Sequence, residues 1–467
     1  MKKAEEFINH EEILASLEEA KKLAKDEAYV DGILKKCEQY QTLTHREAAV
    51  LLECDKPETL SRMRDIANKI KETIYGKRIV LFAPLYLSNY CVNNCKYCGF
   101  KHTNCALPRK KLTQEQIRQE VIALQDMGHK RLALEVGEDD VNCPLDYVLE
   151  SIKTIYSIKH KNGAIRRVNV NIAATTVENY AKLKEAGIGT YILFQETYHK
   201  PTYEAMHPQG PKHNYAYHTE AMDRAMQGGI DDVGIGTLYG LYDYKYETVA
   251  MIMHAEHLEE TFGVGPHTIS VPRLRPASGV STAEYPHLVG DEQFKKLVMV
   301  LRLSVPYTGM IISTRETKEM RDELLHVGIS QISAASCTGI GGYAEENRTE
   351  EDTAQFELGD HRDMDQVLTE LIESGYIPSF CTACYREGRT GERFMRLAKS
   401  GQIHNVCQPN ALITLKEFLT DYGSERARKA GEILFGREVQ NIPNEKVREL
   451  TKEYLAKIEA GERDFRF

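Results

Sequence analysis

Hydrophobic residues follow two different periods along this chain, and the period changes near residue 76. Residues 1–75 carry apolar side chains at helical spacing, as at Ile13, Leu17 and Leu23. This spacing predicts an arm of amphipathic helices. From residue 79 onward, short apolar and β-branched runs alternate with helical patterns, which predicts repeated strand–helix units.

Eight apolar runs are candidate strands, at residues 79–88, 131–137, 167–174, 190–197, 232–240, 267–273, 307–314 and 331–336. Most are apolar throughout, as expected of parallel strands that are buried on both faces. Helices between them begin at capping residues such as Thr113 and Thr176 and end at a glycine. We therefore predict an α/β fold: a (β/α)8 TIM-type barrel over 76–375, with a helical N-terminal extension (1–75) and a C-terminal extension (376–467).

Composition and charge limit the classes of protein to which this chain can belong. Hydrophobic residues make up 42% of the chain and charged residues 28%, which is ordinary for a globular protein. The net charge is -9 and no long basic block occurs, so we expect neither nucleic acid nor a membrane as a partner. The N-terminus is acidic rather than an apolar signal core, and no run is long and apolar enough to span a membrane. We therefore expect a cytoplasmic protein.

The chain has 11 cysteines, and the cytosol keeps thiols reduced, so their clustering indicates metal or redox chemistry. Cys91, Cys95 and Cys98 form the motif CVNNCKYC directly after the first predicted strand. Three thiolates can bind three irons of a four-iron cube and leave the fourth iron open to another ligand. The alternative is a zinc site, which needs a fourth ligand such as His102.

A second set of cysteines lies far downstream. Cys381 and Cys384 form CTAC, and Cys407 follows after 22 residues. This set also has three thiolates and no obvious fourth ligand. A zinc site completed by His404 and an iron–sulfur cluster explain these residues equally well.

Beyond the cysteines, several segments are distinctive: LFQETYHK, HPQGPKHNY, GIDDVGIGTLYGLYDY, HTISVPRLRPASG, IGGY and the terminal CTACYREGRTGERFMRLAKSGQIHNVCQPN. With the CVNNCKYC motif they resemble the radical S-adenosylmethionine (SAM) superfamily and, within it, the tyrosine lyases of [FeFe]-hydrogenase maturation, the HydG family. The resemblance covers essentially the whole chain. The middle portion is also similar to the tyrosine lyase of thiazole biosynthesis, which lacks the three-cysteine extension.

The resemblance implies a function. A deoxyadenosyl radical would start cleavage of the Cα–Cβ bond of L-tyrosine to give p-cresol and dehydroglycine. Dehydroglycine would then be converted to carbon monoxide and cyanide, which leave on iron together with cysteine for assembly of the hydrogenase H-cluster. The implied cofactors are SAM and two [4Fe-4S] clusters, the C-terminal one with an additional iron held by His267. An electron donor such as ferredoxin or flavodoxin and the other hydrogenase maturases are the implied partners.

Two other functions are compatible with parts of the sequence. A 2-iminoacetate synthase of thiazole biosynthesis would stop at dehydroglycine. A zinc-stabilised binding protein would have no catalytic role.

The remaining site residues are expected in the barrel mouth, where the loops after the strands form the active site. With the first three cysteines we assign Glu196 to catalysis, as a proton acceptor or a cofactor ligand. We add Arg273 and Arg315, because a guanidinium group binds a carboxylate such as that of tyrosine through two hydrogen bonds. Each arginine alone is equally compatible with a structural ion pair. The residues predicted to bind the SAM cofactor are Tyr97, Val136, Gly137, Glu138, Asn171, Glu196 and Gly236.

Overall fold

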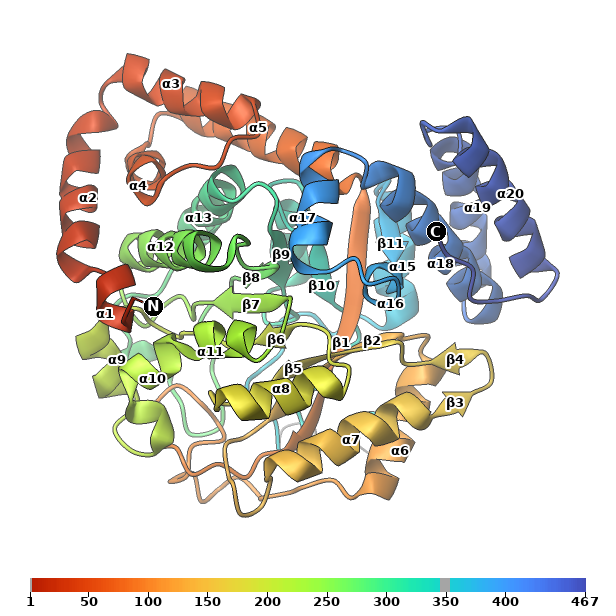
Figure 1. Cartoon of the computed structure of the whole chain (residues 1–467), viewed down its shortest axis with the longest axis horizontal. Coiled ribbons are helices and arrows are strands. Elements are labelled where there is room, and N and C mark those ends of the chain that lie inside the picture. The colour runs from red at the N-terminus through yellow and green to blue at the C-terminus, as the bar shows by residue number, and fades with distance from the viewer. Residues whose placement is uncertain (1, 345–352) are drawn as a thin grey trace.

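The computed structural model describes residues 2–344 and 353–467. Its centre is a closed barrel of eight parallel strands, in which each strand pairs with the next and β10 pairs back with β1 (Figure 1). The strands are β1 (Arg78–Ser88), β2 (Arg131–Val136), β5 (Arg167–Asn171), β6 (Tyr191–Ile192), β7 (Val233–Gly236), β8 (Thr268–Ser270), β9 (Gly309–Ile312) and β10 (Gln331–Ser333). All eight predicted strands and the barrel fold are confirmed. Most strands are shorter than predicted, because the apolar runs continue into the loops that leave the barrel.

Helices surround the strands. They are α6 (Gln114–Asp126), α7 (Leu145–Ser157), α8 (Val177–Glu185), α9 (Lys200–Met206), α10 (Tyr215–Thr219), α11 (Ala221–Gln227), α12 (Tyr244–Phe262), α13 (Asp291–Ser304), α14 (Lys318–Leu325) and α15 (Met364–Glu373). A small hairpin, β3 (Lys159–His160) and β4 (Gly163–Ala164), follows α7. The predicted caps are confirmed: Thr113 and Thr176 accept backbone hydrogen bonds at the starts of α6 and α8, and Gly128 and Gly187 follow these helices with positive φ.

The N-terminal arm is helical, as predicted. It consists of α1 (Ala4–Phe7), α2 (His10–Leu23), α3 (Glu27–Glu38), α4 (His45–Glu53) and α5 (Pro57–Tyr75). Helix α4 packs against α12 and α13, and α5 packs against α13 (Figure 1). The arm therefore covers the outside of the barrel.

The C-terminal extension begins as part of the barrel sheet. Its first strand, β11 (Ile377–Ser379), pairs in parallel with the start of β1, where Arg78 lies opposite Ile377. Helices α16 (Ala383–Arg386), α17 (Gly391–Lys399), α18 (His404–Asp421), α19 (Glu425–Glu438) and α20 (Glu445–Glu459) follow. This pairing brings the downstream cysteines to the end of the barrel where the strands begin. No helix in the described part of the chain is long and apolar enough to cross a membrane.

Candidate active site and second cysteine site

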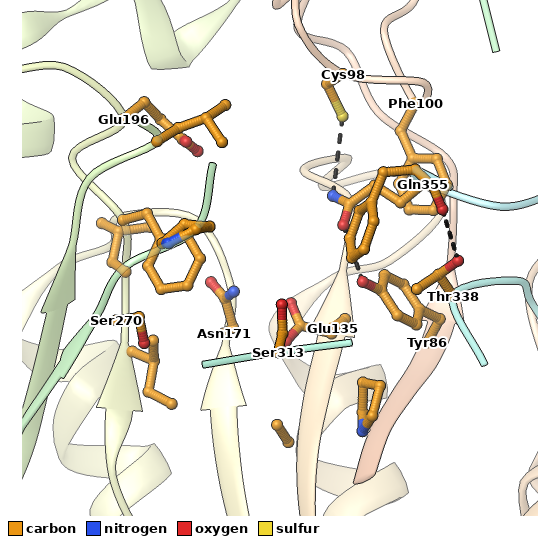
Figure 2. Close-up of a pocket in the computed structure, with 18 of the residues that line it drawn as sticks. Tyr86, Cys98, Phe100, Glu135, Asn171, Glu196, Ser270, Ser313, Thr338 and Gln355 are labelled. Atoms are coloured by element: carbon orange, nitrogen blue, oxygen red, sulfur yellow. Dashed lines mark hydrogen bonds between the residues drawn. The ribbon is translucent and has the colours of Figure 1, made fainter. Parts of the chain in front are cut away.

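A cavity of about 220 Å³ lies inside the barrel toward the ends of the strands. It will be called the upper cavity. Figure 2 shows Cys98 at one end of it and Glu135 deeper in the barrel. The predicted site residues that line it are Cys91, Cys95, Tyr97, Cys98, Val136, Gly137, Glu138, Asn171, Glu196 and Arg315. The structure thus brings together most of the residues that were selected from the sequence.

The end of β2 is pressed against the cysteine loop. Gly137 donates a backbone hydrogen bond to Ser88 (3.1 Å), and Val92 donates one to Glu138 (2.8 Å). A Cβ atom on Gly137 would lie 2.3 Å from the carbonyl oxygen of Tyr90, closer than two such atoms can approach. Only glycine therefore allows the Val-Gly-Glu segment to lie beside the cysteines.

The surroundings of the three cysteines fit an iron–sulfur cluster. The side-chain amide of Asn93 donates to the sulfur of Cys91 (3.8 Å), and that of Gln355 donates to the sulfur of Cys98 (3.8 Å) (Figure 2). Hydrogen bonds to the sulfurs are a common feature of such clusters. Burial raises the pKa of Cys98 to about 11, so this thiol needs a bound metal centre to ionise at neutral pH. His102 is exposed and does not line the cavity, so the structure does not support the alternative zinc site.

Glu196 has an unusual backbone conformation. Its φ is 68°, in the left-handed region that residues other than glycine rarely adopt. The carboxylate accepts a hydrogen bond from Lys212 (2.8 Å). Burial alone would lower the pKa of Lys212, but the charges of Glu196 and Cys95 raise it above its ordinary value. Strain of this kind persists where the surrounding structure enforces it, often at active sites. The partly buried ion pair with Lys212 holds Glu196 at the cavity wall.

Glu135 is a cavity residue that the sequence analysis missed. Alternate residues of β2 point into the barrel, and both Ala133 and Glu135 line the cavity. Burial raises the pKa of Glu135 to about 8, although Arg315 and a hydrogen bond from Asn171 oppose the shift. The acid is therefore neutral at pH 7. Its position in the segment LALEV, whose other residues are all apolar, is the signal that could have identified it.

We expect Glu135→Gln to change how stability depends on pH. The ordinary carboxyl pKa is 4.5, and that of Glu135 is about 8, so the folded protein holds a proton that the unfolded chain releases between these values. Its stabilising contribution is complete below pH 4.5 and is lost as the pH rises toward 8. Urea unfolding at pH 5 and pH 8 should show a smaller loss of stability in the variant, by at least about 1 kcal/mol. Identical losses in the two proteins would contradict the raised pKa.

The structure corrects the assignment of Arg273. Its guanidinium makes two hydrogen bonds to Glu316, one of 2.9 Å, and a third to Asp291 (2.7 Å). Arg273 does not line the cavity, and its charge is already balanced. Arg315 does line the cavity. Its guanidinium stacks over Phe356, 3.3 Å from the ring centre, and makes no hydrogen bond that the structure records with any described residue. Arg315 is therefore the arginine placed to bind a carboxylate.

Gly236 lies behind the cavity wall rather than on it. A Cβ atom there would lie 2.7 Å from the ring of Phe194 and 2.9 Å from the carbonyl oxygen of Ser270. The glycine therefore allows Phe194 to pack closely against β7, and the ring of Phe194 lines the cavity. The predicted contact of Gly236 with SAM is not supported.

The second cysteine set lies in a smaller cavity of about 50 Å³, which will be called the lower cavity. Cys381, Cys384, Cys407 and His267 all line it. The backbone amide of Ala383 donates to the sulfur of Cys381 (3.4 Å). A hydrogen bond from Cys407 lowers the pKa of Cys384 below the ordinary thiol value, which favours a thiolate. The predicted metal ligands therefore line one cavity, and three cysteines are the ligand number of a cluster with one open iron. Among the described residues, no group of three or more histidine, cysteine or acidic side chains is arranged to hold a single metal ion. The side chain of His404 lies outside what the structure describes.

The two cavities lie along one barrel axis. On β1, Arg78 and Val80 line the lower cavity, whereas Phe82, Pro84 and Tyr86 line the upper one. These are alternate residues of one strand, so their side chains share the inner face. Arg78 and Tyr86 lie about 26 Å apart at the extension of a β-strand. The barrel therefore holds two separate cysteine sites, one toward each end.

Comparison with known proteins places the chain among radical SAM proteins. Residues 85–255 match the radical SAM superfamily, and residues 270–377 match the biotin and thiamin synthesis associated domain. The 2-iminoacetate synthase of Escherichia coli (strain K12) is 31% identical over 337 residues, which cover 72% of this chain and 86% of that protein.

Solved structures are similar over more of the chain. A crystal structure of HydG, a maturase of the [FeFe]-hydrogenase, has a TM-score of 0.95 and 62% identity, and the match covers 99% of this chain and 100% of that one. The FeFe-hydrogenase maturase HydG from Carboxydothermus hydrogenoformans has a TM-score of 0.84 and 40% identity, and the match covers 97% and 100%. Both matches therefore include the C-terminal cysteine extension.

Proposed function

This chain belongs to the HydG family of radical SAM enzymes, and we propose on that premise that it cleaves L-tyrosine to p-cresol and dehydroglycine. We further propose that it converts dehydroglycine to carbon monoxide and cyanide for assembly of the [FeFe]-hydrogenase H-cluster. The observation that carries the proposal is the pair of three-cysteine cavities toward opposite ends of one barrel. A lyase that stopped at dehydroglycine would have no use for the lower one.

The upper cavity is the tyrosine site. Cys91, Cys95 and Cys98 would hold a [4Fe-4S] cluster, which when reduced would supply one electron to the sulfonium of SAM for its cleavage to methionine and the deoxyadenosyl radical. The Val-Gly-Glu segment lies beside these cysteines and is placed to contact SAM. Arg315 binds the tyrosine carboxylate, since its guanidinium lines the cavity and has no hydrogen-bond or ion-pair partner among the described residues.

We expect Arg315→Lys to raise KM for tyrosine. Lysine keeps the charge but loses the two-pronged geometry, and a hydrogen bond to a charged group contributes about 1.5–3 kcal/mol, so KM should rise at least about ten-fold. Steady-state p-cresol release at varied tyrosine measures the effect.

Arg273→Lys is the matched control. Its partners are Glu316 and Asp291, so this change should reduce stability without a comparable rise in KM. If Arg273→Lys raised KM for tyrosine more than Arg315→Lys does, Arg273 rather than Arg315 would bind the tyrosine carboxylate.

The lower cavity is the site of the second reaction. Cys381, Cys384 and Cys407 would hold the second [4Fe-4S] cluster, and His267 would hold the additional iron. His267 is positioned by a hydrogen bond between its Nε2 and the hydroxyl of Tyr385 (2.8 Å). Free cysteine is the proposed co-substrate here. Ferredoxin or flavodoxin as electron donor and the other hydrogenase maturases are the proposed protein partners.

Turnover of the reconstituted protein tests the proposal. Tyrosine, SAM and a reductant should yield p-cresol, and deoxyhaemoglobin in the same vessel should trap carbon monoxide. p-Cresol without carbon monoxide would favour a 2-iminoacetate synthase. A zinc-loaded protein without iron or sulfide would favour the binding-protein alternative.

A further inference from the structure

Two charged side chains of the upper cavity have no partner of opposite charge. The acidic, lysine and arginine side chains that line it are Glu135, Glu138, Glu196, Lys212 and Arg315. Glu196 accepts a hydrogen bond from Lys212 (2.8 Å), and Glu138 accepts one from the side-chain amide of Asn93. The structure records no ion pair between Glu135 or Arg315 and any described residue. The cavity therefore offers one acid and one guanidinium to a ligand.

Glu135 and Arg315 face the same space. Glu135 lies opposite Tyr86 of β1 and Asn171 of β5 in the sheet, and Figure 2 shows the side chains of these three residues in the cavity. Burial raises the pKa of Glu135, and the charge of Arg315 opposes this rise. The two α-groups of an amino acid carry opposite charges, and each needs a partner when it is buried. With the tyrosine carboxylate at Arg315, Glu135 is the remaining partner for the amino group.

The ionisable groups around Glu135 keep their charge states near neutral pH. Burial raises the pKa of Tyr86 well above its ordinary value and lowers that of His218 to about 3. Glu196 is held in its ion pair with Lys212, and its negative charge adds to the burial that favours the neutral form of Glu135. The pKa of Glu135 is about 8, so a ligand can change the protonation of this acid at neutral pH.

Formation of dehydroglycine requires a proton acceptor near the substrate nitrogen. The ammonium nitrogen of tyrosine carries three hydrogens, whereas the imine nitrogen of dehydroglycine carries one. The deoxyadenosyl radical would take one hydrogen as an atom, so the other must leave as a proton. A side chain that accepts this proton has to lie within hydrogen-bond reach of the amino group.

We propose that Glu135 binds the α-amino group of tyrosine and accepts one proton from it. This inference rests on the proposed function, in which tyrosine is the substrate of the upper cavity. In this step one N–H bond of the ammonium breaks, its electron pair stays on nitrogen, and the proton bonds to a carboxylate oxygen of Glu135. The proton that Glu135 carries before tyrosine binds leaves to solvent during binding, so the amino group and Glu135 share the ammonium proton.

Proton release on tyrosine binding tests the inference. The cluster-loaded protein would bind tyrosine in the presence of S-adenosylhomocysteine, which yields no radical, and calorimetry in buffers of different ionisation enthalpy would count the protons. We expect release of about one proton per tyrosine at pH 7, and less as the pH rises through about 8, because Glu135 is then already ionised. 3-(4-Hydroxyphenyl)propionate lacks the amino group and should bind without proton release.

Two results would overturn the inference without any variant: tyrosine binding at pH 7 without proton release, or equal release by the analogue that lacks the amino group. p-Cresol formation by the same preparation with SAM and a reductant tests the lyase function separately.

Variants assign the released proton to Glu135. Glu135→Gln should bind tyrosine without proton release, and its kcat for p-cresol should fall about 100-fold. It should still bind 3-(4-hydroxyphenyl)propionate, which shows that its cavity is intact. Glu135→Asp keeps an acid and should keep the release. Asp140→Asn is the matched control, because Asp140 follows β2 but is exposed and outside the cavity. Release that persists in Glu135→Gln, or is lost in Asp140→Asn, would contradict the assignment.

Discussion

Cys91→Ala is expected to abolish p-cresol formation. Three thiolates are the minimum that holds a cube with one open iron, and this change removes one of them from the wall of the upper cavity. The variant should lose about four irons per chain, and no deoxyadenosine should form from SAM. Iron and sulfide analysis, together with chromatography of p-cresol and deoxyadenosine, measures both losses.

Cys105→Ala is the matched control for this prediction. Cys105 lies a few residues beyond the CVNNCKYC motif, and it is exposed and outside the upper cavity. Its replacement should leave iron content and p-cresol formation unchanged. If Cys91→Ala still released p-cresol at the wild-type rate, the cysteines would not hold the reacting cluster.

Cys384→Ala is expected to separate the two reactions. Carbon monoxide should fall to background, because the lower cavity loses a ligand of its cluster. Tyrosine cleavage should stay within about two-fold of wild type, since the upper cavity has its own three cysteines. These follow the far end of β1, a strand that extends about 26 Å from Arg78 to Tyr86. Carbon monoxide trapping and p-cresol release, measured on one sample, give the ratio of carbon monoxide to p-cresol formed.

Loss of SAM cleavage in Cys384→Ala would contradict this prediction. If a correctly folded Cys384→Ala protein no longer cleaved SAM, the two cysteine sites would not work independently. Circular dichroism and the iron content of the remaining cluster establish that the variant is folded. His267→Ala, which leaves all six cluster cysteines in place, should also lower carbon monoxide relative to p-cresol.

Local patterns were sufficient for much of the site. The spacing of Cys91, Cys95 and Cys98 belongs to one loop, and Gly137 follows a strand that is recognisable from its own residues. Such features depend only on residues that are neighbours along the chain, so they can be recognised without knowledge of the tertiary structure. The barrel was predictable for the same reason, since each strand–helix unit repeats a short apolar pattern.

The position of a side chain relative to distant segments of the chain was not predictable in this way. Arg273 and Arg315 both follow strands, and nothing nearby in sequence shows that Glu316 neutralises Arg273. Gly236 was assigned to SAM, but Phe194 covers it. Glu135 stands in an apolar run, and only closure of the barrel shows that its side chain faces the cavity.

By itself the sequence determined the two sets of three cysteines, the eight strand–helix units and the family that they resemble. Tertiary structure decided which charged groups are already paired, as Arg273 is with Glu316, and which line a cavity with no hydrogen-bond or ion-pair partner among the described residues, as Arg315 does. It also placed the cysteine sites toward opposite ends of one barrel, because β11 pairs with the start of β1. Residue types and spacings are set along the chain, whereas burial and charge pairing depend on contacts between distant segments that exist only after the barrel closes.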